Sequence, residues 1–390
     1  MSALYEKSIE LLLKYQDPSG AYLASPNFLA YRYAWLRDGS FCAHALAQAG
    51  ETESALRFHA WVLGVLKRYR AKLERCIQAA RQGSPPPARR CLHSRFTVEG
   101  REVPGNWGHH QLDGLGAWLW AYAAFTSEVA PADRPLLMLV RDYLAALWRF
   151  PCSDCWEEHE DQLHPNSLAA VCAGLQALGV LLDDDSARRA AEEIRQFILE
   201  QAVCDGRIVK SLGNPAVDAS LLSLAVPYGV LAPDDPRMAA TVAEIERSLR
   251  ANAAGVHACG VHRYAADTYY GGGEWLLLTA WLGWYYAVLA DAPGASGLVG
   301  RPSLAAGAGA PETSGKDAQP TEKIAAILAW IEAQAGADGS LPEQVPAHLN
   351  HPAGFPYWVE KWGPIASPLL WSHAQYMILR QAVERAKSQP

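Results

Sequence analysis

The sequence has no long apolar run, no basic stripe and no recognisable leader. No stretch approaches 18 uninterrupted apolar residues, so we expect no membrane-spanning segment. Basic residues form no run longer than a pair such as Arg89 and Arg90, and the formal net charge is −7, which argues against nucleic acid as a partner and for a neutral substrate. Residues 1–16 lack the basic start and the cleavage site of a signal peptide. We therefore expect a cytoplasmic protein whose eight cysteines are reduced.

Strand-like alternation is also scarce, whereas helical periodicity runs through the chain. Apolar residues recur with a period near 3.6 in twelve segments. These are residues 3–15, 39–50, 52–82, 111–127, 133–150, 166–182, 185–202, 217–229, 236–250, 273–291, 320–335 and 367–387. When these twelve helices are numbered in chain order, the loops from odd to even helices are long and rich in functional groups. Most loops from even to odd helices are short. If odd helices form an outer ring and even helices an inner ring, the long loops all emerge at one end. The sequence therefore predicts an all-α fold, an (α/α)6 barrel of twelve helices in two concentric rings.

One segment breaks this pattern. Residues 292–319 are rich in Gly, Ala, Pro and Ser, a composition typical of a flexible connection. The two helices that follow are too few to bury their own apolar faces. We therefore expect residues 1–390 to form a single catalytic domain with a flexible surface loop at about 292–319.

The long loops bring acidic, guanidinium and indole groups to the predicted rim. They hold residues 31–38, 106–113, 154–158, 262–270 and 341–344, with Trp358 and Trp362 further on. The chain has 14 Trp, and although most will pack in the core, an indole face can also stack on a sugar ring. A crater with carboxyls for chemistry and aromatic walls for sugar rings is what an exo-acting sugar hydrolase needs.

Six short motifs in these loops carry a family resemblance. They are W-L-R-D at 35–38, N-W-G-x-x-Q-x-D-G at 106–114, D-x-W-E-E at 154–158, R-Y-x-x-D-x-Y-x-G at 263–271, L-P-E-Q at 341–344 and S-P-L-L-W-S-H-A-Q-Y at 367–376. In this order, over nearly the whole chain, they resemble glycoside hydrolase family 15, the glucoamylase family. The family's (α/α)6 fold agrees with the helix pattern.

The resemblance implies roles for particular residues. Glu157 matches the family's general acid and Glu343 its general base. The substrate-binding positions implied are Trp35, Arg37, Asp38, Trp107, Trp156, Glu158, Arg263 and Asp267. The resemblance further implies an inverting α-glucosidase that releases β-D-glucose and uses no metal or cofactor.

Inversion sets physical requirements for the two carboxyls. They must lie roughly 6.5–9.5 Å apart, so that a water fits between the base and the sugar. We expect burial against Trp156 and the nearby Glu158 to raise the pKa of Glu157 and keep it protonated, while Glu343 is ionised.

The chain also departs from the family pattern. Cys155 replaces a more usual apolar residue, and Ala266 stands where some members carry an acid, so leaving-side specificity is open. No β-sandwich or starch-binding module is visible in the sequence. These features favour a short soluble substrate, of the isomaltose α-1,6 type, with maltose-type and trehalose-type hydrolysis as alternatives and a non-catalytic sugar-binding barrel as a further one.

Other interpretations of the same residues are open. The pair Glu157 and Glu158 is also typical of a helix start, and Arg37 with Asp38 of a local salt bridge. The spacing of Cys152, Cys155, His159 and His164 resembles a zinc site or, for the two cysteines, a redox pair, although the Cys and His pairs are closer together than is usual. The sequence assigns neither linkage preference nor oligomeric state.

Overall fold

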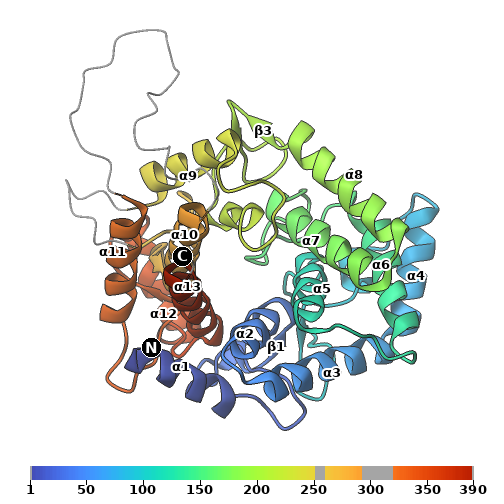
Figure 1. Cartoon of the computed structure of the whole chain (residues 1–390), viewed down its shortest axis with the longest axis horizontal. Helices are drawn as coiled ribbons and strands as arrows, with labels where there is room; N and C mark the ends of the chain where they lie inside the picture. Colours follow the sequence, from blue (N-terminus) through green and yellow to red (C-terminus); the bar gives the residue numbers. More distant parts are fainter. Residues whose placement is uncertain (1, 251–259, 292–318, 389–390) are drawn as a thin grey trace.

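The computed structural model describes residues 2–250, 260–291 and 319–388 and shows two rings of helices (Figure 1). The outer ring consists of α1 (Ala3–Lys14), α3 (Thr52–Arg68) with α4 (Arg70–Arg81), α6 (Arg134–Leu147), α8 (Asp185–Gln201), α9 (Pro236–Leu249) and α11 (Pro320–Ala333). The inner ring consists of α2 (Leu36–Gln48), α5 (Asp113–Phe125), α7 (Pro165–Leu182), the 3-10 helix η3 (Ala219–Leu224), α10 (Leu276–Asp291) and α13 (Leu370–Ser388). Each inner helix contacts the next in this order, and α13 contacts α2, so the ring closes. The (α/α)6 barrel is confirmed.

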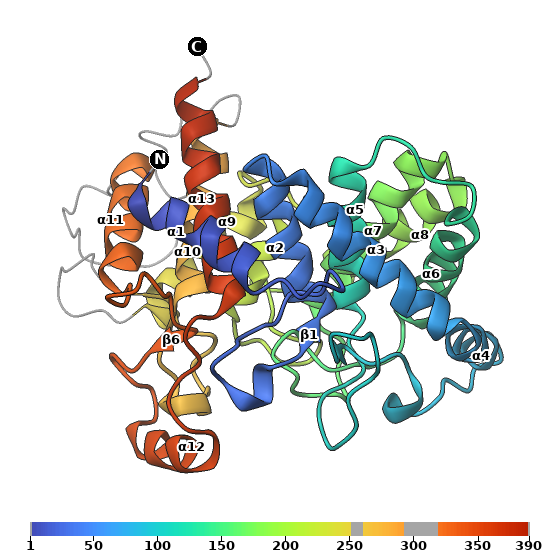
Figure 2. The ribbon, with the colours of Figure 1, turned by 90° about the horizontal axis from the view of Figure 1, so that it is seen from below.

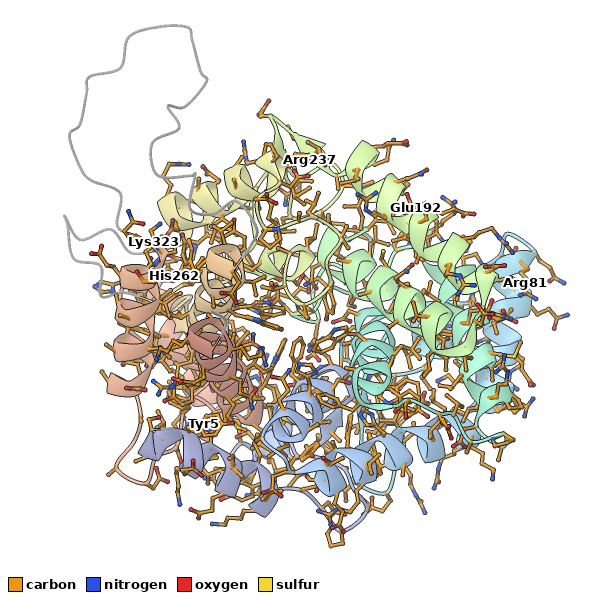
Figure 3. All side chains as sticks on the ribbon, viewed as in Figure 1. Tyr5, Arg81, Glu192, Arg237, His262 and Lys323 are labelled. Atoms are coloured by element: carbon orange, nitrogen blue, oxygen red, sulfur yellow. The ribbon has the colours of Figure 1, made fainter. Side chains whose placement is uncertain are left out.

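The two rings differ in how their sequences bury apolar residues. Inner helix α10 is apolar on all faces and buries every residue from 276 to 287. Outer helix α8 buries a single stripe at spacings of three and four residues, ending at Ile194 and Ile198. The charged side chains of Arg81, Glu192 and Arg237 lie on the outer helices (Figure 3). The core therefore lies within the inner ring and between the rings.

Helix α7 is long and apolar enough to cross a membrane by length and composition alone. However, 78% of that stretch is buried inside the protein, where α7 packs against α5 and α8. Its composition is that of a helix covered by protein on both sides.

Two of the expected helices differ from the structure. The segment 52–82 is two helices, because the backbone of Tyr69 leaves helical angles and its hydroxyl accepts a hydrogen bond from the Glu102 N–H. The segment 217–229 is only the six-residue η3, because Pro227 has no N–H to continue a helix. Residues 292–318, which make up almost all of the expected flexible loop, lie outside the described residues.

Short elements hold the long loops together at one end of the barrel. In the part of the chain that the structure describes, there are three antiparallel pairs of two-residue strands: β1 (Ala34–Trp35) with β2 (Arg95–Phe96), β3 (Val203–Cys204) with β4 (Arg207–Ile208), and β5 (Glu274–Trp275) with β6 (Gln344–Val345). The helix α12 (Phe355–Trp362) lies in the last long loop. Figure 2 shows β1, β6 and α12 at the end of the barrel opposite the two termini.

Candidate active site

The long loops enclose a cavity of about 340 Å³ at this end. Within the described residues, five of the six loops from an outer to an inner helix contribute to its wall. Nine of the ten residues selected from the sequence line it: Trp35, Arg37, Asp38, Trp107, Trp156, Glu157, Glu158, Arg263 and Glu343. The tenth, Asp267, is fully buried behind Arg263 and does not line the cavity. The cavity is thus of the size and mixed polarity typical of a small-ligand site.

Glu157 lies in a tight turn rather than at a helix start. Its φ is +71°, a left-handed value that is costly for a residue with a side chain. The Asp154 carboxylate holds the turn by accepting hydrogen bonds from the N–H groups of Trp156 and Glu158, both at 2.9 Å. Gly108 packs so close that a Cβ there would lie 2.3 Å from the Glu157 carbonyl oxygen. The conformation is therefore imposed by its surroundings.

Indole groups surround the Glu157 carboxyl. Trp35 Nε1 donates to Oε1 and Trp107 Nε1 donates to Oε2, while Gln111 Nε2 donates to Oε1 at 3.3 Å. Burial raises the pKa of Glu157, and the nearby Arg37 guanidinium opposes that rise. The expected direction is thus confirmed.

The expected cause of this shift needs correction. The indole of Trp156 turns away from Glu157 and donates to Asp218, at 3.0 and 3.1 Å. The indoles bonded to the acid are those of Trp35 and Trp107. Among the charges, Asp38 raises the pKa of Glu157, and Glu158 is not one of the principal contributors.

Glu343 lies immediately before β6 and is fixed through its backbone. Its N–H donates to Ala366 O at 2.9 Å, and its carbonyl accepts from Leu276 N–H at 3.3 Å. Burial raises the pKa of Glu343 to about 8, opposed by Arg263 and by a hydrogen bond from Tyr31. The raised pKa favours the neutral form of Glu343 in the free enzyme, whereas the sequence led us to expect an ionised group.

Tyr31 is a site residue that the sequence reasoning did not select. Its hydroxyl hydrogen-bonds Tyr269 at 2.8 Å, and both Glu343 and Glu157 raise its pKa, so it lies near both carboxyls. A signal was available, because Tyr31 lies four residues before the W-L-R-D motif, in the same loop.

The floor of the cavity is built by the first turn of α2. Arg37 Nη1 donates to Gln111 Oε1 at 2.7 Å and to Asp113 Oδ2 at 2.9 Å, and Arg37 Nε lies 3.5 Å from Asp38 Oδ2. Its guanidinium carbon lies 5.1 Å from the ring centroid of Trp371, which also lines the cavity. Arg37 and Asp38 therefore form a local ion pair and also line the cavity.

A second charged group, around Arg263, also lines the cavity. Arg263 pairs with Asp267 through Nε, at 2.8 Å, and through Nη2. Its Nη2 also donates to Glu158 Oε1 at 3.3 Å, and Tyr264 hydroxyl donates to Glu158 Oε2 at 2.5 Å. Asp267 thus orients Arg263, and Arg263 and Tyr264 orient Glu158.

Aromatic residues of α12 line the mouth. Trp358 and Trp362 both contribute to the wall, as does Lys361, whose ammonium lies 4.7 and 5.3 Å from their ring centroids. Trp358 Nε1 is anchored by a hydrogen bond to Thr268 O at 2.9 Å.

The residues considered for zinc do not gather. Among the described residues, only Asp154, Glu158 and His159 bring three ligand-type atoms together, and neither Cys152 nor Cys155 belongs to that group. The Lys210 ammonium lies 3.7 Å from Asp154 Oδ2 and already supplies a cation there.

An (α/α)6 barrel whose loops surround two cavity carboxyls with indoles and guanidinium groups has the architecture of a sugar hydrolase. Comparison with known proteins agrees: the family model "Glycosyl hydrolases family 15" matches residues 1–381. The chain belongs to glycoside hydrolase family 15.

Individual relatives place it within that family. An isomaltose glucohydrolase from Kribbella flavida is 41% identical over 392 residues, covering 96% of this chain and 91% of the relative. The solved wild-type structure of a glycosidase has a TM-score of 0.83 at 39% identity, covering 98% of this chain and 96% of the other. A bacterial glucoamylase complexed with acarbose shares the fold, with a TM-score of 0.68 at 20% identity. The match covers 99% of this chain and 56% of the glucoamylase.

Proposed function

We propose that this protein is an inverting exo-α-glucosidase in which Glu157 is the general acid and Glu343 the general base. The observation that carries the proposal is that two carboxyls 186 positions apart in the sequence line the same cavity. Glu343 is buried and Glu157 half-buried, and each has a raised pKa, as is typical of catalytic carboxyls.

The surroundings of the two carboxyls suit different steps. Glu157, held by a tight turn and two indoles, gives its proton to the glycosidic oxygen as the bond to the leaving sugar breaks. Glu343 takes a proton from water as that water attacks the anomeric carbon from the opposite face, which inverts the configuration. Tyr31, which also lines the cavity, lowers the pKa of Glu343 and so favours the ionised form that a base needs. The water proton thus ends on Glu343 and the acid's proton on the leaving sugar.

Binding is assigned to the groups around these carboxyls. Arg37 and Asp38 at the floor hold hydroxyls of the terminal glucose, and Trp35 and Trp107 wall the scissile bond. Arg263, oriented by Asp267, and Glu158 bind further hydroxyls of the substrate.

We further propose that the substrate is a short α-1,6-linked gluco-oligosaccharide such as isomaltose. The support is the 41% identity with a relative named for isomaltose, over nearly the full length of both chains. Relatives named as trehalases match only partial segments, at 24–29% identity.

The substrate proposal is tested by kcat/KM on isomaltose, panose, maltose and trehalose with one enzyme preparation. We expect isomaltose to exceed maltose and trehalose by at least about 10-fold, corresponding to about 1.4 kcal/mol of transition-state discrimination. A preference for maltose or trehalose would overturn the linkage assignment and leave the hydrolytic class intact.

A further inference from the structure

Within the described residues, the loop between α8 and η3, residues 202–218, is the one outer-to-inner loop that contributes nothing to the cavity wall. It nevertheless carries a buried ion pair directly behind that wall. Lys210 Nζ lies 2.5 Å from Asp218 Oδ2, and the two side chains are 5% and 3% exposed. A buried ion pair is a weak source of stability, because desolvation of both charges offsets their attraction. Its contacts indicate another role.

Asp218 connects the inner ring to the residue before the acid. Its carboxylate accepts both the indole N–H of Trp156, at 3.0 and 3.1 Å, and the backbone N–H of Ser220 in η3, at 2.9 Å. Trp156 immediately precedes Glu157. The orientation of this indole is therefore fixed by a barrel helix on the far side of the cavity wall.

Lys210 connects to the other parts of the same turn. Its ammonium lies 3.7 Å from the free oxygen of Asp154, whose second oxygen caps the turn through the N–H groups of Trp156 and Glu158. It also lies 3.6 Å from the ring centroid of Tyr264, whose hydroxyl donates to Glu158. One cation thus contacts two groups that hold the acid turn.

We propose that Lys210 and Asp218 are positioning residues for the general acid. Their ion pair sets the orientation of the 154–158 turn and so holds the Glu157 carboxyl against the glycosidic oxygen. The left-handed backbone of Glu157 persists only where its surroundings impose it, and displacement of a reacting group by 1 Å can cost about 100-fold in rate. This inference rests on the proposed role of Glu157.

The test compares two substrates on Lys210→Met, which removes the charge and keeps the length. Isomaltose needs a proton from the acid to expel an alcohol, whereas α-D-glucosyl fluoride expels fluoride with little protonic assistance. We expect kcat on isomaltose to fall about 10- to 100-fold, with KM changed less than about 3-fold. On the fluoride, kcat should stay within about 3-fold of wild type.

Lys323→Met is the matched control. Lys323 also forms an ion pair, at 2.9 Å with Glu246, and its ammonium lies 4.6 Å from the ring centroid of Tyr286. However, it belongs to α11 in the outer ring (Figure 3). Its loss removes a similar lysine without touching the acid turn. We expect both substrates to be hydrolysed at the wild-type rate.

Asp218→Asn keeps an oxygen that can accept from Trp156 and removes the charge, so it should show the same selective loss, smaller in size. It carries the test if Lys210→Met fails to fold in a thermal unfolding assay. An equal loss on both substrates, or a folded variant with undiminished turnover of isomaltose, would overturn the positioning role. Glu157→Gln is measured alongside: if it too loses the fluoride activity, the acid assignment fails and not the positioning of the turn.

Discussion

At the residue scale, the chemistry depends on two carboxyls with different partners, Glu343 buried and Glu157 half-buried. The Glu157 carboxyl receives two indole N–H groups and an amide, whereas Glu343 Oε2 has no hydrogen-bond partner within the described part of the chain. The Glu157 carboxyl is held in place by these donors, whereas Glu343 has an oxygen available to a water. The unpartnered oxygen of Glu343 suits the base role, whereas at Glu157 the hydrogen bonds from Trp35 and Gln111 lower the pKa and burial outweighs them.

Substitution of each carboxyl should separate the two roles. Glu157→Gln should lower kcat on isomaltose by about 100-fold or more, since general acid catalysis contributes about 10²–10⁴, and spare α-D-glucosyl fluoride. Glu343→Gln should abolish turnover of both substrates, because each needs the activated water. Steady-state kinetics with the two substrates measures this, and loss of fluoride activity in Glu157→Gln but not in Glu343→Gln would reverse the assignment.

The pH profile should report the burial of Glu343. A base acts only when ionised, so activity appears as pH rises through its pKa, which burial raises to about 8 in the free enzyme. An acid acts only when protonated, so activity is lost as pH rises through the raised pKa of Glu157. We expect a bell-shaped kcat/KM profile with an acidic limb well above the ordinary glutamate value of about 4.3.

Bound substrate should move that acidic limb. Sugar hydroxyls and the attacking water donate hydrogen bonds to Glu343, which favours its charged form and lowers its pKa. The acidic limb of kcat, which reports the substrate complex, should therefore lie below that of kcat/KM. Coincident limbs near pH 4.3 in both profiles would contradict this account.

The sequence predicts which residues meet at the site better than it predicts the directions of their side chains. Nine of the ten chosen residues line the cavity, because each follows or precedes a helix end on the same rim. The indole direction of Trp156 and the position of Asp267 behind Arg263 were not predictable. Both depend on partners that the fold supplies, such as Asp218, which lies 62 residues from Trp156 in the sequence.

At the element scale, the site is fixed by short ladders and close backbone contacts rather than by long strands. β1 with β2 ties the loop of Trp35 to that of Arg95, and β5 with β6 ties the loop of Trp275 to the residue after Glu343. Two-residue strands give no detectable alternation in a sequence, so neither ladder could be predicted. The inner and outer rings could be predicted, because their helices are long and strongly periodic.

The contact between Gly108 and the acid turn gives an element-scale prediction. Gly108→Ala places a methyl 2.3 Å from the Glu157 carbonyl oxygen, so the turn must shift. We expect kcat/KM on isomaltose to fall at least about 10-fold in a folded protein. Gly64→Ala, in α3 with no atom within 4 Å of the added methyl, should keep full activity and gain about 0.5–1 kcal/mol of stability. Wild-type kinetics in Gly108→Ala would show that the turn is not held by this contact.

At the scale of the whole molecule, the closed inner ring explains how distant residues meet. Because each loop from an outer to an inner helix opens at the same end, Asp38 and Glu343 share one cavity although 305 positions separate them. The short 3-10 helix η3 occupies one position in the inner ring, between α7 and α10. A full α-helix is therefore not needed at every position for the ring to close. The fold thus supplies the rim, and the loop residues decide the chemistry.

Inversion by Glu157 and Glu343 across the bound sugar is tested most directly by the anomer of the first product. Hydrolysis of isomaltose at high enzyme concentration, followed by proton NMR before mutarotation, reports which anomer of glucose appears first. We expect β-D-glucose to appear first. Initial release of α-D-glucose would show retention and contradict it.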